Sequence, residues 1–269
     1  MEEGLVSIIT PCYNGAKYIS ETIDSVIAQT YPKWEMIIVD DGSKDNSADI
    51  VREYEAKDER IHLIQQKNAG SAAARNNGIR QCNGQYIALL DADDLWKPDF
   101  LKKQIVFMKK RKAVCVFCSY ERIDGHSKQI LHPTIAKKKI MTKDMRVMNH
   151  IGCLSGLYDS SKHGKIYLRE ELKSLRDDYA YWYDIVALED AAYGNPEILA
   201  SYRVLDTSTT GNKKKLIKKQ YQFYRTHLKE SVPEAAINVV RWGVAGIVKF
   251  GGIAPEKMGG YCRRDSMGS

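Results

Sequence analysis

Three aspartates lie within four residues at the end of an apolar segment. Asp91, Asp93 and Asp94 follow the run 86–90, which is typical of a buried strand. Carboxylates this close repel one another unless a cation or hydrogen-bond donors compensate them, and Mg²⁺ and Mn²⁺ prefer oxygen ligands. Alternate residues of an extended segment face the same way, so Asp91 and Asp93 are expected to address one ligand while Asp94 turns into the fold. The alternative is that the cluster only caps a following helix.

A second acidic pair, Asp40-Asp41, follows the apolar run 36–39 and precedes Gly42-Ser43. An Asp-Gly turn before a helix is common and by itself needs no ligand. At a strand end next to the Asp91 cluster, however, the pair could accept a hydrogen bond from a base N–H or a ribose hydroxyl. The two acidic clusters together therefore suggest a nucleotide site.

Alternating strands and helices must position these residues. Apolar runs predict strands at 5–9, 36–39, 61–64 and 86–90, separated by helical patterns at 19–27, about 47–54 and 71–82. Beyond residue 100 the sequence predicts an amphipathic helix and a strand within 101–118, a helix at 177–193, a strand at 198–203 and a basic helix at 213–229, whereas 119–150 shows no assignable element. The alternation predicts an α/β fold with a doubly wound, mostly parallel sheet, whose ligands bind at the carboxyl ends of the strands.

Charge divides the 269-residue chain into two unlike parts. Residues 1–100 hold 10 Lys and Arg against 17 Asp and Glu, whereas residues 101–269 hold 31 against 17. An acidic first part suggests a cation, and a basic second part suggests phosphates. The composition is that of a soluble globular protein, and six scattered cysteines fit reduced thiols. Without an apolar stretch of about 18 residues or a basic leader, we expect a cytoplasmic protein.

Four segments resemble the successive signatures of family 2 glycosyltransferases. They are Val6-Ser-Ile-Ile-Thr-Pro-Cys-Tyr-Asn14, Ile38-Val-Asp-Asp-Gly-Ser43, Ala74-Arg-Asn-Asn-Gly78 and Leu90-Asp-Ala-Asp-Asp94. The resemblance implies an inverting, metal-dependent enzyme of the GT-A fold, of the type that builds bacterial surface polysaccharides. It covers residues 5 to about 100 closely and extends more loosely to about 205. It does not identify the sugar.

The resemblance also implies roles for residues of these segments. Tyr13 would pack against the base of the donor, Asp41 would accept from the uracil N3–H with Asp40 beside it, and Arg75 would reach the nucleotide. Asp91 would approach the ribose, and Asp93 would bind the Mn²⁺ or Mg²⁺ that bridges the two phosphates. The remaining donor-site residues that it implies are Pro11, Asn14 and Ala92.

A catalytic base is expected in the second half, because inversion needs a carboxylate to remove the proton of the acceptor hydroxyl. The segment Arg176-Asp-Asp-Tyr-Ala-Tyr-Trp182 resembles the family's Glu-Asp-x-x-x-Trp sequence and makes Asp178 the candidate base, with Asp177 in the place of the usual Glu. A solvated acidic pair at a helix start is the alternative. Asp177, Trp182 and Arg203 are possible acceptor or diphosphate contacts, although Trp182 could instead belong to the core.

Three parts are expected along the chain: a nucleotide-sugar-binding half at 1–100, an acceptor-binding half at 101–210 and a basic, amphipathic helical appendage at 211–269 with a frayed end. The apolar and basic residues of 213–250 suggest peripheral contact with the inner face of the cell membrane, where the acceptor would be a glycan or a polyprenyl-diphosphate-linked sugar. Packing on the enzyme or a homodimer interface is the alternative. No nucleic-acid partner is expected, because no recognition motif is present.

Two other functions remain open at this point. A sugar-nucleotide pyrophosphorylase would also be doubly wound and metal-dependent, but it is expected to begin with a Gly-rich basic loop, which Pro11-Cys-Tyr-Asn-Gly15 is not. A non-enzymatic basic module for membranes or nucleic acids would leave the acidic clusters without a role. The sequence therefore favours a glycosyltransferase.

Overall fold

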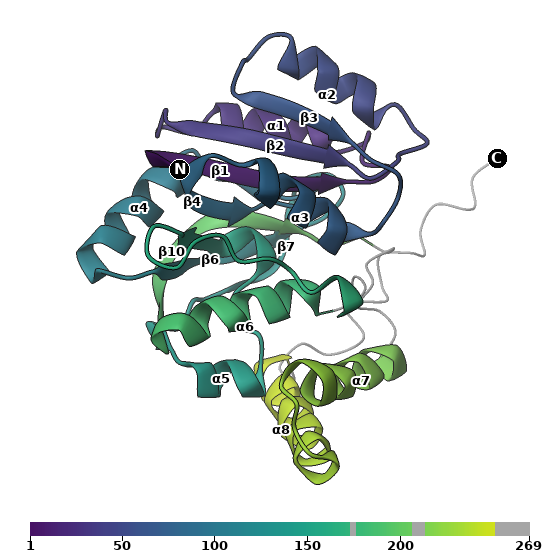
Figure 1. The fold of residues 1–269 in the computed structure, drawn as a ribbon, viewed down its shortest axis with the longest axis vertical. Helices are drawn as coiled ribbons and strands as arrows, with labels where there is room; N and C mark the ends of the chain where they lie inside the picture. The colour runs from purple at the N-terminus through teal and green to yellow at the C-terminus, as the bar shows by residue number, and fades with distance from the viewer. Residues whose placement is uncertain (173–175, 206–212, 251–269) are drawn as a thin grey trace, which may run out of the picture.

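One mixed sheet forms the centre of the protein. The computed structural model of the chain describes residues 1–172, 176–205 and 213–250 (Figure 1). Within them the sheet has the strand order β3-β2-β1-β4-β9-β6-β10-β5, with β7 paired to β6 and β8 paired to β10. The strands are β1 (Glu2–Cys12), β2 (Trp34–Asp40), β3 (Ile61–Gln65), β4 (Gly84–Leu89), β5 (Leu95–Trp96), β6 (Cys115–Ile123), β7 (Gln129–Thr134), β8 (Lys139–Ile140), β9 (Gly156–Asp159) and β10 (Ala192–Arg203).

Helices cover both faces of this sheet, because its strands are apolar on both sides. Successive residues of β1 enter different cores: Ile8 packs with the residues of one face, and Ile9 with those of the other. The first face is covered by α1 (Ile19–Ile27), α2 (Ser47–Glu55) and α4 (Phe100–Arg111), and the second by α3 (Ser71–Gln81), α5 (Thr142–Val147) and α6 (Asp177–Glu189). The expected α/β architecture with flanking helices is confirmed.

Helix α3 approaches the sheet unusually closely, and Gly78 makes this possible. A Cβ atom at Gly78 would lie 2.7 Å from Cγ2 of Ile9 on β1. Such a distance is far below ordinary van der Waals contact, so a larger residue would push the helix outward. The close approach sets the position of Arg75, one turn earlier on the same helix.

The first four strands are parallel, as their helical connections predict. β1 pairs in parallel with both β2 and β4, and β2 pairs in parallel with β3. The later part of the sheet is mixed, because β9 runs antiparallel to both of its neighbours, β4 and β6. The unassigned region 119–150 forms the rest of β6 with β7, β8 and α5. β10 begins at Ala192, six residues before the expected strand.

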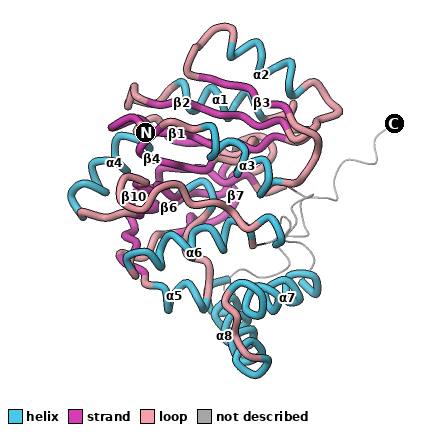
Figure 2. The backbone as a smooth tube through the Cα atoms, in the orientation of Figure 1, coloured by secondary structure: helices cyan, strands magenta, loops and turns pink. Residues whose placement is uncertain are grey.

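The C-terminal helices pack beyond α5 and α6, at the end of the molecule opposite β3 (Figure 2). They are α7 (Lys213–Gln222), a short π-helix (Phe223–His227) and α8 (Val232–Phe250). Phe223, Tyr224 and Ala235 anchor them in the core that α6 also lines. The expected frayed end at 251–269 lies outside the described residues. Among the described helices, none is both long and apolar enough to cross a membrane.

Candidate active site

The two acidic clusters predicted from the sequence lie at the ends of β2 and β4, the two strands that flank β1. Asp40 is the last residue of β2, and Asp91 and Asp93 follow the end of β4, with β1 between these two strands. Thr22 of α1 donates a hydrogen bond of 2.9 Å to the carbonyl oxygen of Ala92, which holds the second cluster against the first helix. The topology therefore brings the candidate donor residues to one edge of the sheet.

Asp41 is held by three donors from the segment after β3. Its carboxylate accepts hydrogen bonds from the backbone N–H groups of Ala69 and Gly70, each at 2.8 Å, and from Nε2 of Gln66, also at 2.8 Å. Asp40 accepts from the backbone N–H of Ser43 at 3.3 Å. Both aspartates are buried, so their positions are fixed before a ligand binds.

The loop after β1 leaves an aromatic ring open to solvent. Tyr13 is 50% exposed, although it lies next to the buried end of a central strand. Asn14 has a φ of +51° and is held from both sides: its N–H donates to Ser43 Oγ at 2.9 Å, and its Oδ1 accepts from the N–H of Lys44 at 2.8 Å. Pro11 pairs with Val39 in the sheet below. The exposed ring is thus carried on a rigid turn, as a stacking surface requires.

Arg75 joins the acidic cluster after β4 to the start of α6. Its guanidinium bonds to Asp91 through Nη2 and to Asp177 through Nη1, the latter at 3.1 Å, and its own side chain is only 6% exposed. Ser71 of α3 donates a second hydrogen bond of 3.1 Å to Asp177. The buried Arg75 guanidinium therefore joins the candidate donor half to the candidate acceptor half.

Asp93 has the properties of a carboxylate that binds a cation. Its backbone carbonyl accepts from Arg203, but no other described residue donates a hydrogen bond to its carboxylate. Burial, together with the negative charge of Asp91, raises the pKa of that carboxyl to about 6. A divalent ion would relieve both effects, so the residue fits the metal role. The described residues contain no cluster of three or more His, Cys, Asp or Glu side chains that could enclose a metal by themselves. The remaining ligands would have to be phosphate oxygens or water.

Asp178 lies in the first turn of α6, close to two cations. Burial and the neighbouring Asp177 raise its pKa to about 6, while Arg75 and Arg176 oppose that shift. Arg176 precedes the helix with a φ of +81°, a backbone conformation that side-chain-bearing residues rarely adopt. Strain of this kind is concentrated at functional sites. A carboxylate with a pKa near neutrality can take up a proton during a reaction.

The structure places three of the expected contact residues inside the fold. Asp177 is 4% exposed, and its carboxylate accepts hydrogen bonds from Arg75 and Ser71. Trp182 is fully buried. It packs directly against Gly156, where an added Cβ atom would lie 2.4 Å from the indole ring. Arg203 is 1% exposed, and its guanidinium donates to protein oxygens. Each side chain points inward, which residue type alone could not indicate.

Several residues of the site were not anticipated. The backbone N–H groups that bind Asp41 carry no signal in the sequence, because any residue could supply them. Cys153 lies beside the acidic cluster, with its Sγ 3.9 Å from Oδ1 of Asp91, and burial raises the pKa of its thiol. Ser71 could have been suspected from its place at the start of a helix, but its partner lies 106 residues away.

Comparisons with known proteins show which sequences the chain resembles. The family model described as glycosyl transferase family 2 matches residues 7–176. The chain is 41% identical over 225 residues to the putative teichuronic acid biosynthesis glycosyltransferase TuaG of Bacillus subtilis. The aligned region covers 82% of this chain and 87% of TuaG. It is 34% identical over 223 residues to the UDP-Glc:alpha-D-GlcNAc-diphosphoundecaprenol beta-1,3-glucosyltransferase WfgD of Escherichia coli, covering 82% and 85% of the two chains.

Solved structures with little sequence identity share the fold. S. aureus TarS in complex with UDP-GlcNAc superposes with a TM-score of 0.68 at 18% identity, over 90% of this chain and 72% of that one. A mannosyltransferase from Pyrobaculum calidifontis in complex with GDP-Man and Mn²⁺ gives 0.62 at 18% identity, over 92% and 75%. The fold is therefore that of the GT-A glycosyltransferases. With both signature clusters at one sheet edge and the family model covering most of the folded core, the chain belongs to glycosyl transferase family 2 and is a glycosyltransferase.

Proposed function

We propose that the protein transfers one sugar, with inversion, from a UDP-sugar to a hydroxyl group of a glycan or a lipid-linked acceptor in surface-polysaccharide biosynthesis. The observation that carries the proposal is the buried bridge through Arg75, which holds the candidate metal-binding segment and the start of α6 together. The names of TuaG and WfgD support the polysaccharide setting, and the UDP-GlcNAc complex of TarS supports a uridine donor. Family membership decides against a pyrophosphorylase or a purely binding module.

The donor half at 1–100 would bind the nucleotide. Tyr13 offers its exposed ring to the base, and Asp41, held by three donors, retains lone-pair capacity to accept from the uracil N3–H. Pro11, Asn14, Asp40 and Ala92 would shape the same pocket from the ends of their strands, with Arg75 holding Asp91 toward the ribose. Asp93 would hold Mn²⁺ or Mg²⁺, and a bound divalent ion would offset the charge that develops on the diphosphate as it leaves.

The acceptor half at 101–210 would supply the base. The Asp178 carboxylate removes the proton of the acceptor hydroxyl, whose oxygen forms a bond to the anomeric carbon from the face opposite the diphosphate. The bond between that carbon and the diphosphate oxygen breaks, and its electron pair leaves with UDP. Arg75 and Arg176 keep Asp178 sufficiently acidic to be ionised at neutral pH, despite its burial.

Calorimetric titration of UDP tests the donor site. The chelator-treated protein is titrated with UDP with and without Mn²⁺, as the wild type and as Asp93→Ala. We expect tight binding only with Mn²⁺ and only in the wild type. Equal binding in both proteins would refute the metal role of Asp93, and a preference for another nucleotide would refute the uridine assignment.

The appendage at 211–269 would bring the enzyme to the cytoplasmic face of the membrane. On α8, Ile237, Val240 and Val244 are each more than half exposed. Beside them, Lys143, Arg146 and Arg241 line a groove of about 360 Å³ between α5 and α8, none of whose lining residues belongs to the active site. An apolar stripe flanked by cations is suited to an anionic bilayer surface.

Co-sedimentation with vesicles tests this attachment. We expect binding to vesicles containing phosphatidylglycerol, weaker binding to pure phosphatidylcholine, and loss of binding in Val240→Asp. Val106→Asp, which replaces an equally exposed valine on α4, serves as the control and should bind normally. If vesicles do not bind, but sedimentation velocity shows a dimer that Val240→Asp dissociates, the stripe is a homodimer interface instead.

A further inference from the structure

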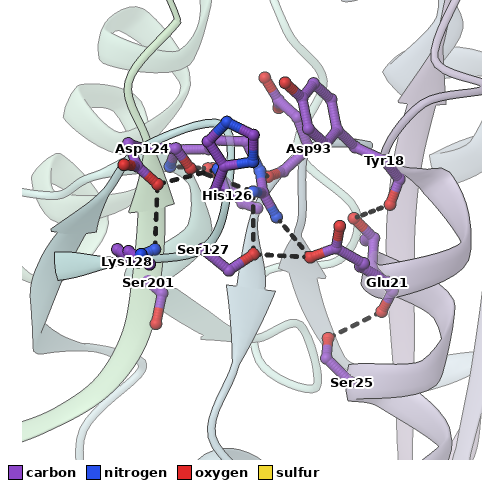
Figure 3. A network of polar contacts seen from close by, with 12 residues as sticks. Tyr18, Glu21, Ser25, Asp93, Asp124, His126, Ser127, Lys128 and Ser201 are labelled. Carbon is purple, nitrogen blue, oxygen red and sulfur yellow. Dashed lines mark hydrogen bonds and ion pairs between the residues drawn. The ribbon is translucent and has the colours of Figure 1, made fainter. Parts of the chain in front are cut away.

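Arg203 ends β10 and is surrounded by oxygen atoms from three other segments. Its Nε donates to the carbonyl oxygen of Asp93 at 2.7 Å, and its Nη2 donates to Oε2 of Glu21 on α1 at 2.9 Å. Its Nη1 donates to the carbonyl oxygen of Asp124 at 3.1 Å and to Ser127 Oγ at 3.0 Å, both in the turn between β6 and β7. Figure 3 shows Glu21 of α1, Asp93 after β4, and Asp124 and Ser127 of the β6–β7 turn close to one another.

The backbone of Arg203 holds the same segment as its side chain. Its N–H donates to Oδ1 of Asp94 at 2.8 Å, so two successive residues of the acidic cluster are bound from one position. The guanidinium also lies over the ring of Tyr18, 4.4 Å from its centroid. Four of its five N–H groups are thus engaged with protein oxygens, and the side chain is fully buried.

We propose that Arg203 is a positioning residue for Asp93: it fixes the backbone that carries the metal-binding carboxylate and does not itself contact the donor. This rests on the proposed function, in which Asp93 binds the cation. Because the acidic cluster carries like charges, its backbone needs an external constraint to hold one conformation. The bond from Nε to the Asp93 carbonyl supplies it, and the three other guanidinium bonds fix the guanidinium itself. Only the planar fork of an arginine reaches Asp93, Glu21 and Ser127 at once, and a lysine would reach one or two of them.

Glu21 supports this role from the other side. Its carboxylate accepts from Arg203 and also from Ser127 Oγ at 2.7 Å, so it closes a ring of bonds between α1 and the turn after β6. Half of the Glu21 side chain is exposed, which allows a substitution there without opening the core. Glu21→Gln therefore tests the network more gently than a change of Arg203.

The experiment uses Arg203→Lys, Glu21→Gln and, as a matched control, Glu121→Gln. Glu121 of β6 also binds a cation, Lys97, and accepts from Ser201 of β10, the strand that carries Arg203, but neither bond involves Asp93. Hydrogen exchange of the peptide spanning 90–96 is measured without metal, and UDP affinity is measured with Mn²⁺ and with chelator.

We expect faster hydrogen exchange at 90–96 in Arg203→Lys and Glu21→Gln, but not in Glu121→Gln. In the same two variants, UDP should bind at least tenfold more weakly in the presence of Mn²⁺. Their UDP affinity in chelator should stay within about twofold of the wild-type value. Unchanged exchange in a folded Arg203→Lys overturns the proposal. The proposal is also overturned if Arg203→Lys loses UDP affinity equally with and without Mn²⁺ while its uridine binding is preserved. That result would indicate that Arg203 contacts the diphosphate directly. Because the exchange readout needs no metal, failure of the metal assignment would appear separately, as metal-independent UDP binding in the wild type.

Discussion

Arg75 and Asp177 form an ion pair of 3.1 Å between residues that lie 102 positions apart. Both side chains are almost completely buried, and Arg75 reaches Asp91 with its other Nη atom. The pair therefore links the helix after β3 to the helix that carries the candidate base. Changes at this link should affect folding and catalysis together.

Replacing Arg75 with Met should lower the free energy of unfolding by about 3–5 kcal/mol, because Asp91 and Asp177 lose their buried partner. Arg80→Met on the same helix is the matched control, since its pair with Glu170 is exposed and should contribute at most about 1 kcal/mol. Urea denaturation followed by circular dichroism gives both values. Similar losses in the two variants would show that the buried pair contributes no more than a surface pair.

The acid limb of the pH–rate profile should follow Asp178. A base must be ionised to act, so kcat/KM is expected to fall as the pH decreases through about 6, the pKa to which burial and Asp177 raise this carboxyl. Removing the cation in Arg176→Gln should move the limb to higher pH, because Arg176 lowers that pKa. Rates of UDP release with a donor and acceptor found by screening provide the measurement. A limb that stays in place in Arg176→Gln would exclude Asp178 as the titrating group.

Asp178→Asn should abolish transfer and yet stabilise the fold at neutral pH. The folded-state pKa is higher than that of the unfolded chain, so the native protein holds a proton that the unfolded chain has lost between about pH 4 and 6. This group therefore reduces stability as the pH rises through that window, and the reduction is complete at pH 7. Removing it should add about 1–3 kcal/mol at pH 7 and much less at pH 4.

Denaturation midpoints of wild type and Asp178→Asn at both pH values measure this gain. Glu189→Gln, at the exposed last residue of the same helix, controls for the general effect of removing a carboxylate. A gain that is independent of pH would contradict the proposed origin.

Gly156→Ala should destabilise the protein by about 1–3 kcal/mol, since the new methyl group would lie 2.4 Å from the Trp182 ring. Gly243→Ala on α8 is the control, because nothing lies within 4 Å of its added Cβ and alanine favours a helix. In a Trp182→Leu background, Gly156→Ala should cost less than it does in the wild type, because the smaller side chain leaves room for the methyl group. If Gly156→Ala melts at the wild-type temperature, the indole is free to move away.

The acidic edge of the site was predictable because it follows from topology. Parallel strands joined by helices place their carboxyl ends at one edge of the sheet. The apolar periodicity alone therefore predicted that Asp40 and Asp91 lie at the same edge. The family signatures then supplied roles that periodicity does not contain, and these roles remain predictions for Tyr13, Asp41, Asp93 and Asp178.

The direction of individual side chains was not predictable. Trp182 and Arg203 have residue types that suit a sugar or a phosphate, yet both are buried by contacts with residues far away in sequence. Arg203 binds Glu21 across 182 positions, and no local pattern reports such a partner. The irregular segment 119–150 was missed because its strands are short and polar on one side, as in β7.

The place of β9 in the sheet has a consequence for synthesis on the ribosome. β4 and β6 become neighbours only through β9, which begins at Gly156, about 40 residues after the start of β6 at Cys115. Until residue 159 has emerged, the nascent chain carries two partial sheets, each with an open edge that can pair with another polypeptide. Pauses in translation before that point would prolong this exposure, and fragments that end there would aggregate.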